Sequence, residues 1–208
     1  MDLFPLIAAE RRRLADSLEA LPAETWESPS LCAGWTVHVV AAHLNAPWEA
    51  SVPTVMVEVA RARSLAGGFD RLARKLATRL SPEECIAGLR DHAEARFTPP
   101  GSGPEAPLTD LIVHGVDMLQ PSGRSVDADP VALAAALEFL TRGNPKTFVP
   151  RGRTDGLAFE ASDLEFRGGP GPSVVRGPAA AVCATLCGRK ALLDELTGEG
   201  LATLASRL

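Results

Sequence analysis

Two stretches of sequence decide the fold and the candidate chemistry: residues 107–119, PLTDLIVHGVDML, and residues 36–44, TVHVVAAHL. In the first, apolar side chains recur every three or four residues, which is the period of an α-helix packed against others. His114 lies among Leu111, Ile112 and Val113 in this pattern and is therefore expected to be buried. A buried imidazole is costly unless its nitrogens are hydrogen-bonded or bound to a metal.

The second stretch has the signals of a helix that begins at Thr36. The threonine hydroxyl can accept a backbone N–H at the helix start, and Val40 and Leu44 share one face with His43. His43 is therefore expected to point inward. Pro47 lacks the amide hydrogen that would bond to the carbonyl of His43, so the helix is expected to kink or stop just after that residue.

Asp110 precedes His114 by four residues, so on a helix the carboxylate and the imidazole lie one above the other. With His43 from a facing helix, three ligands can meet. Two imidazoles and a carboxylate suit zinc or another divalent transition ion, with at least one position left open for water, a thiolate or a substrate. The pattern leaves a second interpretation open, in which His114 is a core histidine hydrogen-bonded to Asp110 without a metal.

Helical periodicity covers most of the remaining sequence before Gly143. Pro22 ends the first amphipathic stretch, and Ser81, Pro82 and Glu84 form a capping box, the start signal of another helix. Apart from the two stretches quoted above, the predicted helices comprise residues 3–21, 52–65, 69–80, 82–97 and 129–140. We therefore expect a mainly α protein.

The pattern changes after Gly143. Residues 157–161, 164–167 and 173–176 alternate in the manner of short strands, separated by glycines and prolines. Two apolar segments, residues 178–187 and 189–196, return to helical spacing before Gly198 and Gly200. We expect a small α+β domain over residues 150–208.

Composition excludes several classes of protein. The net charge of −5 and the pI near 5.4 disfavour binding to a phosphate backbone, so no nucleic-acid partner is expected. The chain has neither an apolar run of the ~20 residues needed to cross a bilayer nor an N-terminal signal pattern, so no membrane association is expected. Four scattered cysteines fit a reducing compartment, and the cytoplasm is the predicted location. Cys183 and Cys187 have the spacing of a helical metal pair but are interpreted as buried structural thiols.

The quoted stretches resemble those of a known family. Residues 30–37, SLCAGWTV, run into residues 40–44, VAAHL, and resemble the second-helix signature of the mycothiol-dependent maleylpyruvate isomerase family, a branch of the DinB-like metal-binding bundles. Residues 110–117, DLIVHGVD, resemble the second signature of that family. The tail is similar to its C-terminal domain at residues 176–178, 188–189 and 196–198. The resemblance extends from Phe4 to Leu208.

This resemblance implies a fold and a site. The fold is an N-terminal DinB-like four-helix bundle over residues 1–145, followed by a small α/β C-terminal domain. The site binds a metal ion, with zinc the first choice, through His43, Asp110 and His114. The implied thiol cofactor is mycothiol. Several family members have Glu at the position of Asp110. The side chain of Asp110 is shorter than that of Glu, so its carboxylate reaches less far.

Other residues are candidates for supporting roles. Asp117 lies one turn after His114 and either orients its imidazole or serves as a surface or capping residue. Arg189 is our candidate catalytic residue: its fork can hold a substrate carboxylate, and the other interpretation is a salt bridge at a helix start. Trp35 and Trp48 flank the helix of His43 and either wall the site or pack in the core. The remaining histidines, His38 and His92, are predicted to lie at the surface.

These elements predict an enzyme that uses a small-molecule substrate and a low-molecular-weight thiol. The thiol would ionise at the open metal position and attack an electrophile that carries a carboxylate. Addition followed by elimination would give cis–trans isomerisation, and addition or displacement alone would give S-transfer. The other class left open is a non-catalytic bundle that binds a metal or small ligand as a sensor, carrier or resistance protein. Either protein is expected to be a monomer or a small homo-oligomer.

Overall fold

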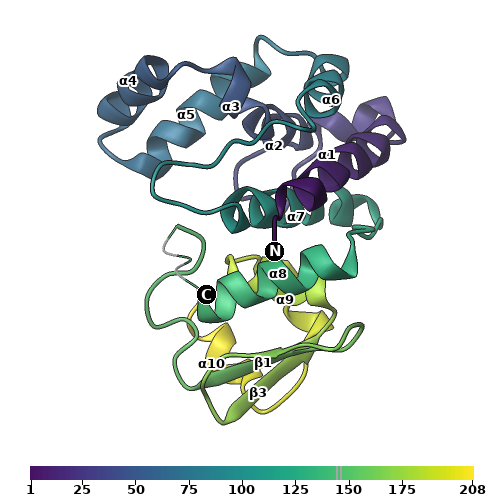
Figure 1. The fold of residues 1–208 in the computed structure, drawn as a ribbon, viewed down its shortest axis with the longest axis vertical. Helices are drawn as coiled ribbons and strands as arrows, with labels where there is room; N and C mark the ends of the chain where they lie inside the picture. The colour runs from purple at the N-terminus through teal and green to yellow at the C-terminus, as the bar shows by residue number, and fades with distance from the viewer. Residues whose placement is uncertain (144, 146) are drawn as a thin grey trace.

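The computed structural model describes residues 1–143, 145 and 147–208. The protein is mainly α-helical with a small sheet near the C-terminus, as predicted (Figure 1). The α-helices described are, in chain order, α1 (Phe4–Glu19), α2 (Val37–Leu44), α3 (Ala46–Glu49), α4 (Val52–Ala62), α5 (Leu65–Ala77), α6 (Pro82–Asp91), α7 (Glu105–Leu119), α8 (Pro130–Arg142), α9 (Ala179–Leu186) and α10 (Leu201–Ala205). Between them lie the 3₁₀ helices η1 (Ala23–Glu27), η2 (Gln120–Ser122) and η3 (Lys190–Glu195) and the strands β1 (Leu157–Ala161), β2 (Arg167–Gly168) and β3 (Ser173–Gly177).

Four helices form the N-terminal bundle. Helix α1 packs against α6 and α7, and α2 packs against the same two helices, so α1, α6, α2 and α7 make a closed ring of contacts. Helix α5 packs on α2 from outside this ring, and α4 packs on α5 at the edge of the molecule (Figure 1). The predicted four-helix bundle is confirmed, with α4 and α5 added to one side of it.

Helix α7 is buried along most of its length because other helices cover it from two sides. Helices α1 and α2 contact it within the bundle, and α8 and α9 contact it from the C-terminal side. Leu108, Ile112 and Leu119 are at most 2% exposed, and burying each such side chain contributes about 1.5–3 kcal/mol. The same packing removes two polar residues of α7 from water, since His114 is 8% and Asp117 0% exposed.

The C-terminal region is a three-stranded sheet covered by helices, which confirms the predicted small α/β unit. The strand order is β2-β1-β3, with β1 antiparallel to β2 and parallel to β3, and Phe159 pairs with Val175 in the parallel register. Helix α9 packs on β1 and β3 on one side and on α7 and α8 on the other. Helices α8 and α9 therefore lie between the bundle and the sheet (Figure 1).

The predicted division lies between residues 145 and 150. Residues 144 and 146, beside it, are outside the described part of the chain. On both sides of it, buried side chains belong to one apolar cluster that includes Leu108 of α7, Leu137 of α8, Phe159 of β1 and Val182 of α9. The bundle and the sheet region thus share a core. Their separation into domains of residues 1–145 and 150–208 stays a prediction.

Two predicted helix boundaries are wrong. The helix predicted over residues 82–97 ends at Asp91, and the Arg11 guanidinium of α1 donates to the carbonyls of His92, Ala93 and Ala95 just after it, at 2.8–3.0 Å. These hydrogen bonds hold the segment after α6 against α1. Arg11 is 3% exposed, so the contact is buried.

The other wrong boundary lies between α4 and α5. The helix predicted over residues 52–65 ends at Ala62, because Arg63 adopts a left-handed conformation with φ of 57°. Ser64 then caps α5, and its hydroxyl accepts the N–H of Gly67 at 3.1 Å. Leu65 therefore belongs to the first turn of α5.

Two predictions in the C-terminal region are also corrected. The strand predicted over residues 164–167 is mostly a bend, and only Arg167 of that segment is in β2. The helix predicted over residues 189–196 is the 3₁₀ helix η3, and α10 after Gly200 was not predicted. Short elements of this kind depend on contacts with neighbours more than on periodicity.

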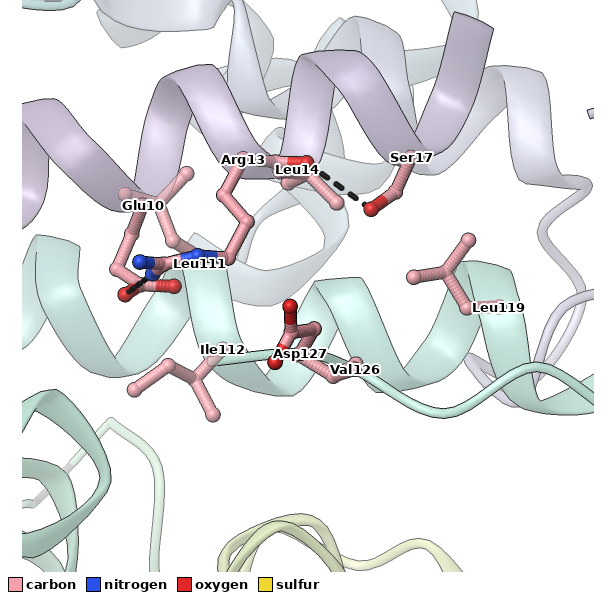
Figure 2. A pocket seen from close by; sticks show the side chains of 9 residues that line it. All are labelled: Glu10, Arg13, Leu14, Ser17, Leu111, Ile112, Leu119, Val126 and Asp127. Atoms are coloured by element: carbon pink, nitrogen blue, oxygen red, sulfur yellow. Dashed lines mark hydrogen bonds and ion pairs between the residues drawn. The ribbon is translucent and has the colours of Figure 1, made fainter. Parts of the chain in front are cut away.

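A small cavity lies between α1, α7 and the segment before α8 (Figure 2). Its volume of about 10 Å³ leaves room for no more than a water molecule. Glu10, on its wall, pairs with Arg13 and accepts the backbone N–H of Asp129 at 3.0 Å. The cavity is thus a packing defect beside a structural ion pair, and it is too small for a substrate.

Within the described residues, no helix combines the length and the apolar character that crossing a bilayer requires.

Candidate metal centre

Helix α7 presents Asp110 and His114 on one face, as their spacing predicts. Asp110 Oδ1 lies 3.4 Å from His114 Nε2, and the two side chains are 33% and 10% exposed. Because neighbouring helices enclose α7, the imidazole of His114 is nearly excluded from solvent. The carboxylate of Asp110 lies at the solvent-accessible edge of the site.

Helix α2 brings His43 to the other oxygen of the same carboxylate. Thr36 caps α2, its hydroxyl accepting the N–H of Val39 at 3.3 Å, and the helix ends at Leu44, consistent with the predicted effect of Pro47. His43 Nε2 lies 3.6 Å from Asp110 Oδ2, and the His43 side chain is 18% exposed. Asp110 therefore faces two imidazoles that come from two helices.

These separations fit a shared metal ion. Bonds of about 2.0–2.1 Å in a tetrahedral shell place neighbouring donors about 3.3 Å apart, close to the 3.4 and 3.6 Å between Asp110 and the two histidines. Ligand atoms of His43, Asp110 and His114 all lie within 4.8 Å of one another. The short hydrogen bond of His114, 2.8 Å long, goes to Asp117 rather than to Asp110. Each of the two separations is thus compatible with a divalent ion between Asp110 and that histidine, and ligation by all three residues stays a prediction.

The charges of the site shift two pKa values in opposite directions. Burial alone would raise the pKa of Asp110, but the neighbouring His114 and His43 outweigh it and lower that pKa to about 2. Burial alone would lower the pKa of His114, but Asp110 and Asp117 outweigh it and raise that pKa. Without a metal, the two carboxylates therefore favour the protonated form of His114.

Asp117 joins the site to the C-terminal region. It accepts hydrogen bonds from Arg189 Nε at 2.9 Å and Nη2 at 2.6 Å, and its Oδ2 lies 2.8 Å from His114 Nδ1. Burial raises the pKa of Asp117, but hydrogen bonds from Arg189 and His114 outweigh it, so the net shift is downward. Of the two interpretations of Asp117, the geometry matches the one in which it orients the imidazole.

Arg189 has a different first partner from the one predicted. Its fork holds Asp117, and its Nη1 donates to the carbonyl of Cys187 at 2.7 Å. The arginine is the residue immediately before η3 and is 14% exposed in its side chain. The structure therefore gives Arg189 a positioning contact, and its catalytic role stays a prediction.

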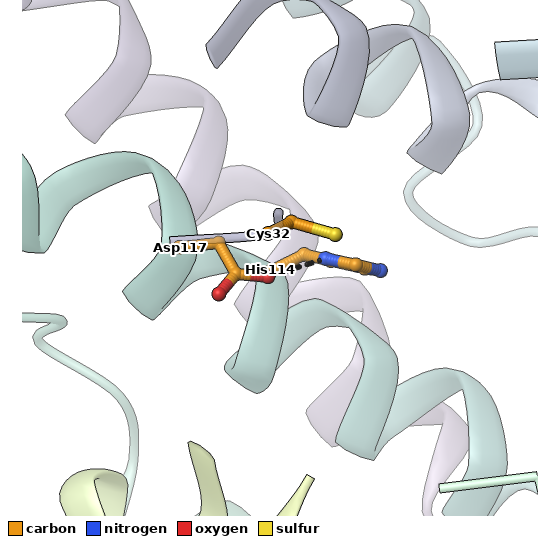
Figure 3. Close-up of side chains that lie close together, drawn as sticks. All are labelled: Cys32, His114 and Asp117. Carbon is orange, nitrogen blue, oxygen red and sulfur yellow. Dashed lines mark hydrogen bonds and ion pairs between the residues drawn. The ribbon is translucent and has the colours of Figure 1, made fainter. Parts of the chain in front are cut away.

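Sequence reasoning missed Cys32, whose sulfur lies within 4.8 Å of ligand atoms of His114 and Asp117 (Figure 3). The N–H of Leu31 donates to the carbonyl of Asp117 at 3.1 Å, which holds this loop against α7. Burial, followed by the charge of Asp117, raises the pKa of Cys32 to about 11, so the group is a thiol at neutral pH. Its place within the SLCAGWTV segment was the available signal.

The other aromatic and histidine predictions have mixed outcomes. The ring of Trp35 lies 5.2 Å from His43 and 6.1 Å from His114, so this residue borders the site. Trp48 stacks on His92 at 4.8 Å, and its indole N–H donates to Asn45 Oδ1 at 2.8 Å. His92 is exposed, as predicted, whereas His38 is half-buried and its Nε2 lies 2.7 Å from the carbonyl of Leu80.

Comparison with known proteins places the chain in a family. The profile of the mycothiol maleylpyruvate isomerase N-terminal domain matches residues 7–119, more than half of the chain. Among solved structures, the mycothiol-dependent maleylpyruvate isomerase is similar over 94% of this chain and 90% of that chain, with a TM-score of 0.56 and 17% identity. A histidine-to-alanine mutant of that isomerase gives the same coverage, a TM-score of 0.57 and 18% identity. No curated protein matches the chain. The protein belongs to the mycothiol maleylpyruvate isomerase family.

Proposed function

We propose that this protein is a metal-dependent enzyme that uses mycothiol to act on a small electrophile, by cis–trans isomerisation or S-transfer. The observation that carries the proposal is the convergence of His43, Asp110 and His114 at metal-ligand separations in a chain of this family. The solved relatives are described as mycothiol-dependent maleylpyruvate isomerases, which supports a thiol-dependent isomerase here. Four free cysteines support a cytoplasmic location, where thiols stay reduced.

His43, Asp110 and His114 would hold a divalent ion, zinc being the first choice for two imidazoles and a carboxylate. When bound, such an ion supplies a position at which a thiol ionises and becomes a nucleophile. The chain supplies the orientation. Asp117 accepts a hydrogen bond from the Nδ1–H of His114, and Nε2 of the same ring faces Asp110.

Arg189 has two tasks in this proposal. It fixes Asp117 through its fork, and N–H groups beyond those three contacts would donate to a substrate carboxylate. Trp35 covers one side of the imidazoles and limits the access of water to the thiolate. These groups position the reactants, and the thiol supplies the bond-forming sulfur.

Cobalt substitution tests both the metal and the thiol. We expect the cobalt-loaded protein to gain a sulfur-to-metal charge-transfer band when mycothiol is added, since a thiolate is a strong ligand for such ions. His43→Ala and His114→Ala should lose the band. His92→Ala is the matched control, because this histidine is exposed and stacks on Trp48, and it should retain the band.

The possible failures are informative. A protein that binds no cobalt, or binds it equally well without His43 and His114, would refute the metal assignment. A protein that binds cobalt through these residues but shows no band with mycothiol would refute the thiol assignment and favour a non-catalytic metal-binding bundle.

A further inference from the structure

Helix α5 places an exposed aromatic ring beside the candidate metal ligands. The ring of Phe69 lies 6.2 Å from the imidazole of His43, edge-on at 79°, and the residue is 37% exposed. Leu65, one turn earlier on the same helix, is 52% exposed. Single exposed apolar residues are common on proteins, but Phe69 lies next to the candidate metal ligands.

A second aromatic ring contacts the same imidazole. Trp35 lies 5.2 Å from His43 at a tilt of 54°, and it is nearly parallel to His114 at 22° and 6.1 Å. Its indole N–H donates to Asp70 Oδ1 at 2.7 Å, which fixes the ring in place. The indole face is thus presented to the site while its polar edge is already satisfied.

Helix α5 holds both rings. Asp70 directly follows Phe69, and Arg74 donates through Nε to Asp70 at 3.0 Å and through Nη2 to the carbonyl of Gly34 at 2.9 Å. Gly34 has φ of 78°, which allows the loop to turn Trp35 toward α5. The two aromatic rings and His43 therefore form a connected unit, with a rigid helix as its base.

The charged groups of the site are already engaged with one another. Asp117 takes the fork of Arg189, and Asp110 faces both histidines. The rings of Trp35 and Phe69 both contact the imidazole of His43, so a molecule bound beside His43 would lie near them. Aromatic rings favour offset or edge-on contact with planar apolar groups. They would therefore select a substrate by its planar apolar group, while its electrophilic carbon reacts with the thiol.

We propose that Trp35 and Phe69 form an aromatic wall that selects electrophiles carrying a planar apolar group, such as an aryl group, next to the carbon that the thiol attacks. This inference rests on the proposed function, because the electrophile reacts with the thiol at the metal ligands. It names the class of substrate, an aryl-bearing electrophile such as an aryl enone, and assigns Phe69 as a specificity-determining residue.

A matched pair of enones tests the wall. The compounds are 4-phenyl-3-buten-2-one and 3-penten-2-one, which carry the same electrophile with a phenyl or a methyl group on the attacked carbon. In each addition the thiol sulfur bonds to that carbon and the thiol proton ends on the neighbouring carbon. We expect Phe69→Ala to lower kcat/KM for the phenyl enone about tenfold and for the methyl enone less than about twofold, since one lost apolar contact has effects of that order.

Two further variants control for the fold and for the ring itself. Phe97, in the segment between α6 and α7, is 36% exposed, nearly the same as Phe69 at 37%. Phe97→Ala should leave kcat/KM unchanged for both enones. Phe69→Tyr keeps a ring at the site and should keep the preference for the phenyl enone. The KM for mycothiol should be the same in Phe69→Ala and the native protein.

An equal loss for both enones in Phe69→Ala would mean that the ring only supports His43, and would overturn the inference. A raised KM for mycothiol would overturn it too, because the rings would then hold the cofactor. No acceleration of the phenyl enone by a protein that shows the cobalt–thiolate band would overturn the inference while the proposed function stands. The absence of the band itself would refute both.

Discussion

The buried carboxylate of Asp117 serves two charged partners, Arg189 and His114, in a space that water does not reach. Removing one member of such a set leaves the others buried without a counter-charge, which typically costs about 3–5 kcal/mol. Asp117 is therefore a stabilising residue that also orients the imidazole of His114 and, after Asp110, contributes to raising the pKa of that candidate ligand. This double role gives the site a pH dependence that differs with and without a metal.

In the metal-free protein, the raised pKa of His114 means that folding favours the protonated imidazole. That contribution to the free energy of unfolding is fully present below the ordinary histidine pKa of about 6.5 and is lost as the pH rises through the raised value. We expect thermal unfolding of chelator-treated protein to show decreasing stability across this interval. Asp117→Asn should reduce the dependence, because it removes one of the two carboxylates that raise the pKa.

Metal binding should depend on pH in the opposite direction from the stability of the metal-free protein. A metal binds the neutral imidazole, so the proton on His114 competes with it and metal affinity should fall as the pH drops through the raised pKa. Competition with a chromophoric chelator at several pH values measures this. Unfolding and metal binding that respond identically to pH in native protein and Asp117→Asn would contradict the assignment.

Helix α2 is short, and its start determines where His43 lies. The helix spans Val37–Leu44, and the Thr36 hydroxyl satisfies one backbone N–H at its beginning. At the start of α6 the Ser81 hydroxyl likewise accepts a backbone N–H, and Glu84 adds a return hydrogen bond to the backbone of Ser81, but α6 carries no candidate ligand. These two helix starts form a natural pair for comparison.

We expect Thr36→Ala and Ser81→Ala each to lower the free energy of unfolding by about 1 kcal/mol, the usual effect of losing a side-chain cap. Only Thr36→Ala should also weaken metal binding, because fraying of α2 moves His43 relative to Asp110. Urea unfolding and metal competition on both variants check this. Equal metal affinity in the two variants would show that α2 is held by packing against α5 and α7 alone.

The whole molecule is joined by the layer of α8 and α9 between the bundle and the sheet (Figure 1). Arg189, just after the end of α9, donates to Asp117 of α7, and buried residues on both sides of the layer belong to one apolar cluster. The C-terminal region therefore completes the surroundings of the candidate metal centre.

We expect the full chain to unfold in one cooperative transition, because separating the two regions would expose the faces of α7 and α8 and leave Arg189 and Asp117 unpaired. Calorimetry should give equal calorimetric and van't Hoff enthalpies. The tryptophans lie at positions 26, 35 and 48, so their fluorescence reports the bundle, and it should change together with far-UV circular dichroism. Two separate transitions would show that residues 1–145 and 150–208 are independent folding units.

The sequence by itself determined the features that depend on neighbours along the chain. The apolar period of residues 107–119 predicts α7, and the four-residue spacing within it places Asp110 beside His114, because a helix brings such positions together. Thr36 and Ser81 mark helix starts through bonds to the backbone three residues ahead. The approach of His43 to the same carboxylate was predicted from its inward face and the family resemblance together.

Only the tertiary structure decided the contacts between distant segments. Arg189 holds Asp117 across 72 residues, Arg11 of α1 donates to carbonyls just after α6, and Phe69 lies beside His43 although nothing in its local pattern marks it. Cys32 reaches His114 because a loop docks on α7 through a backbone hydrogen bond. Periodicity and capping report local backbone preferences, whereas these contacts depend on how helices pack, which is set by the shape of the whole core.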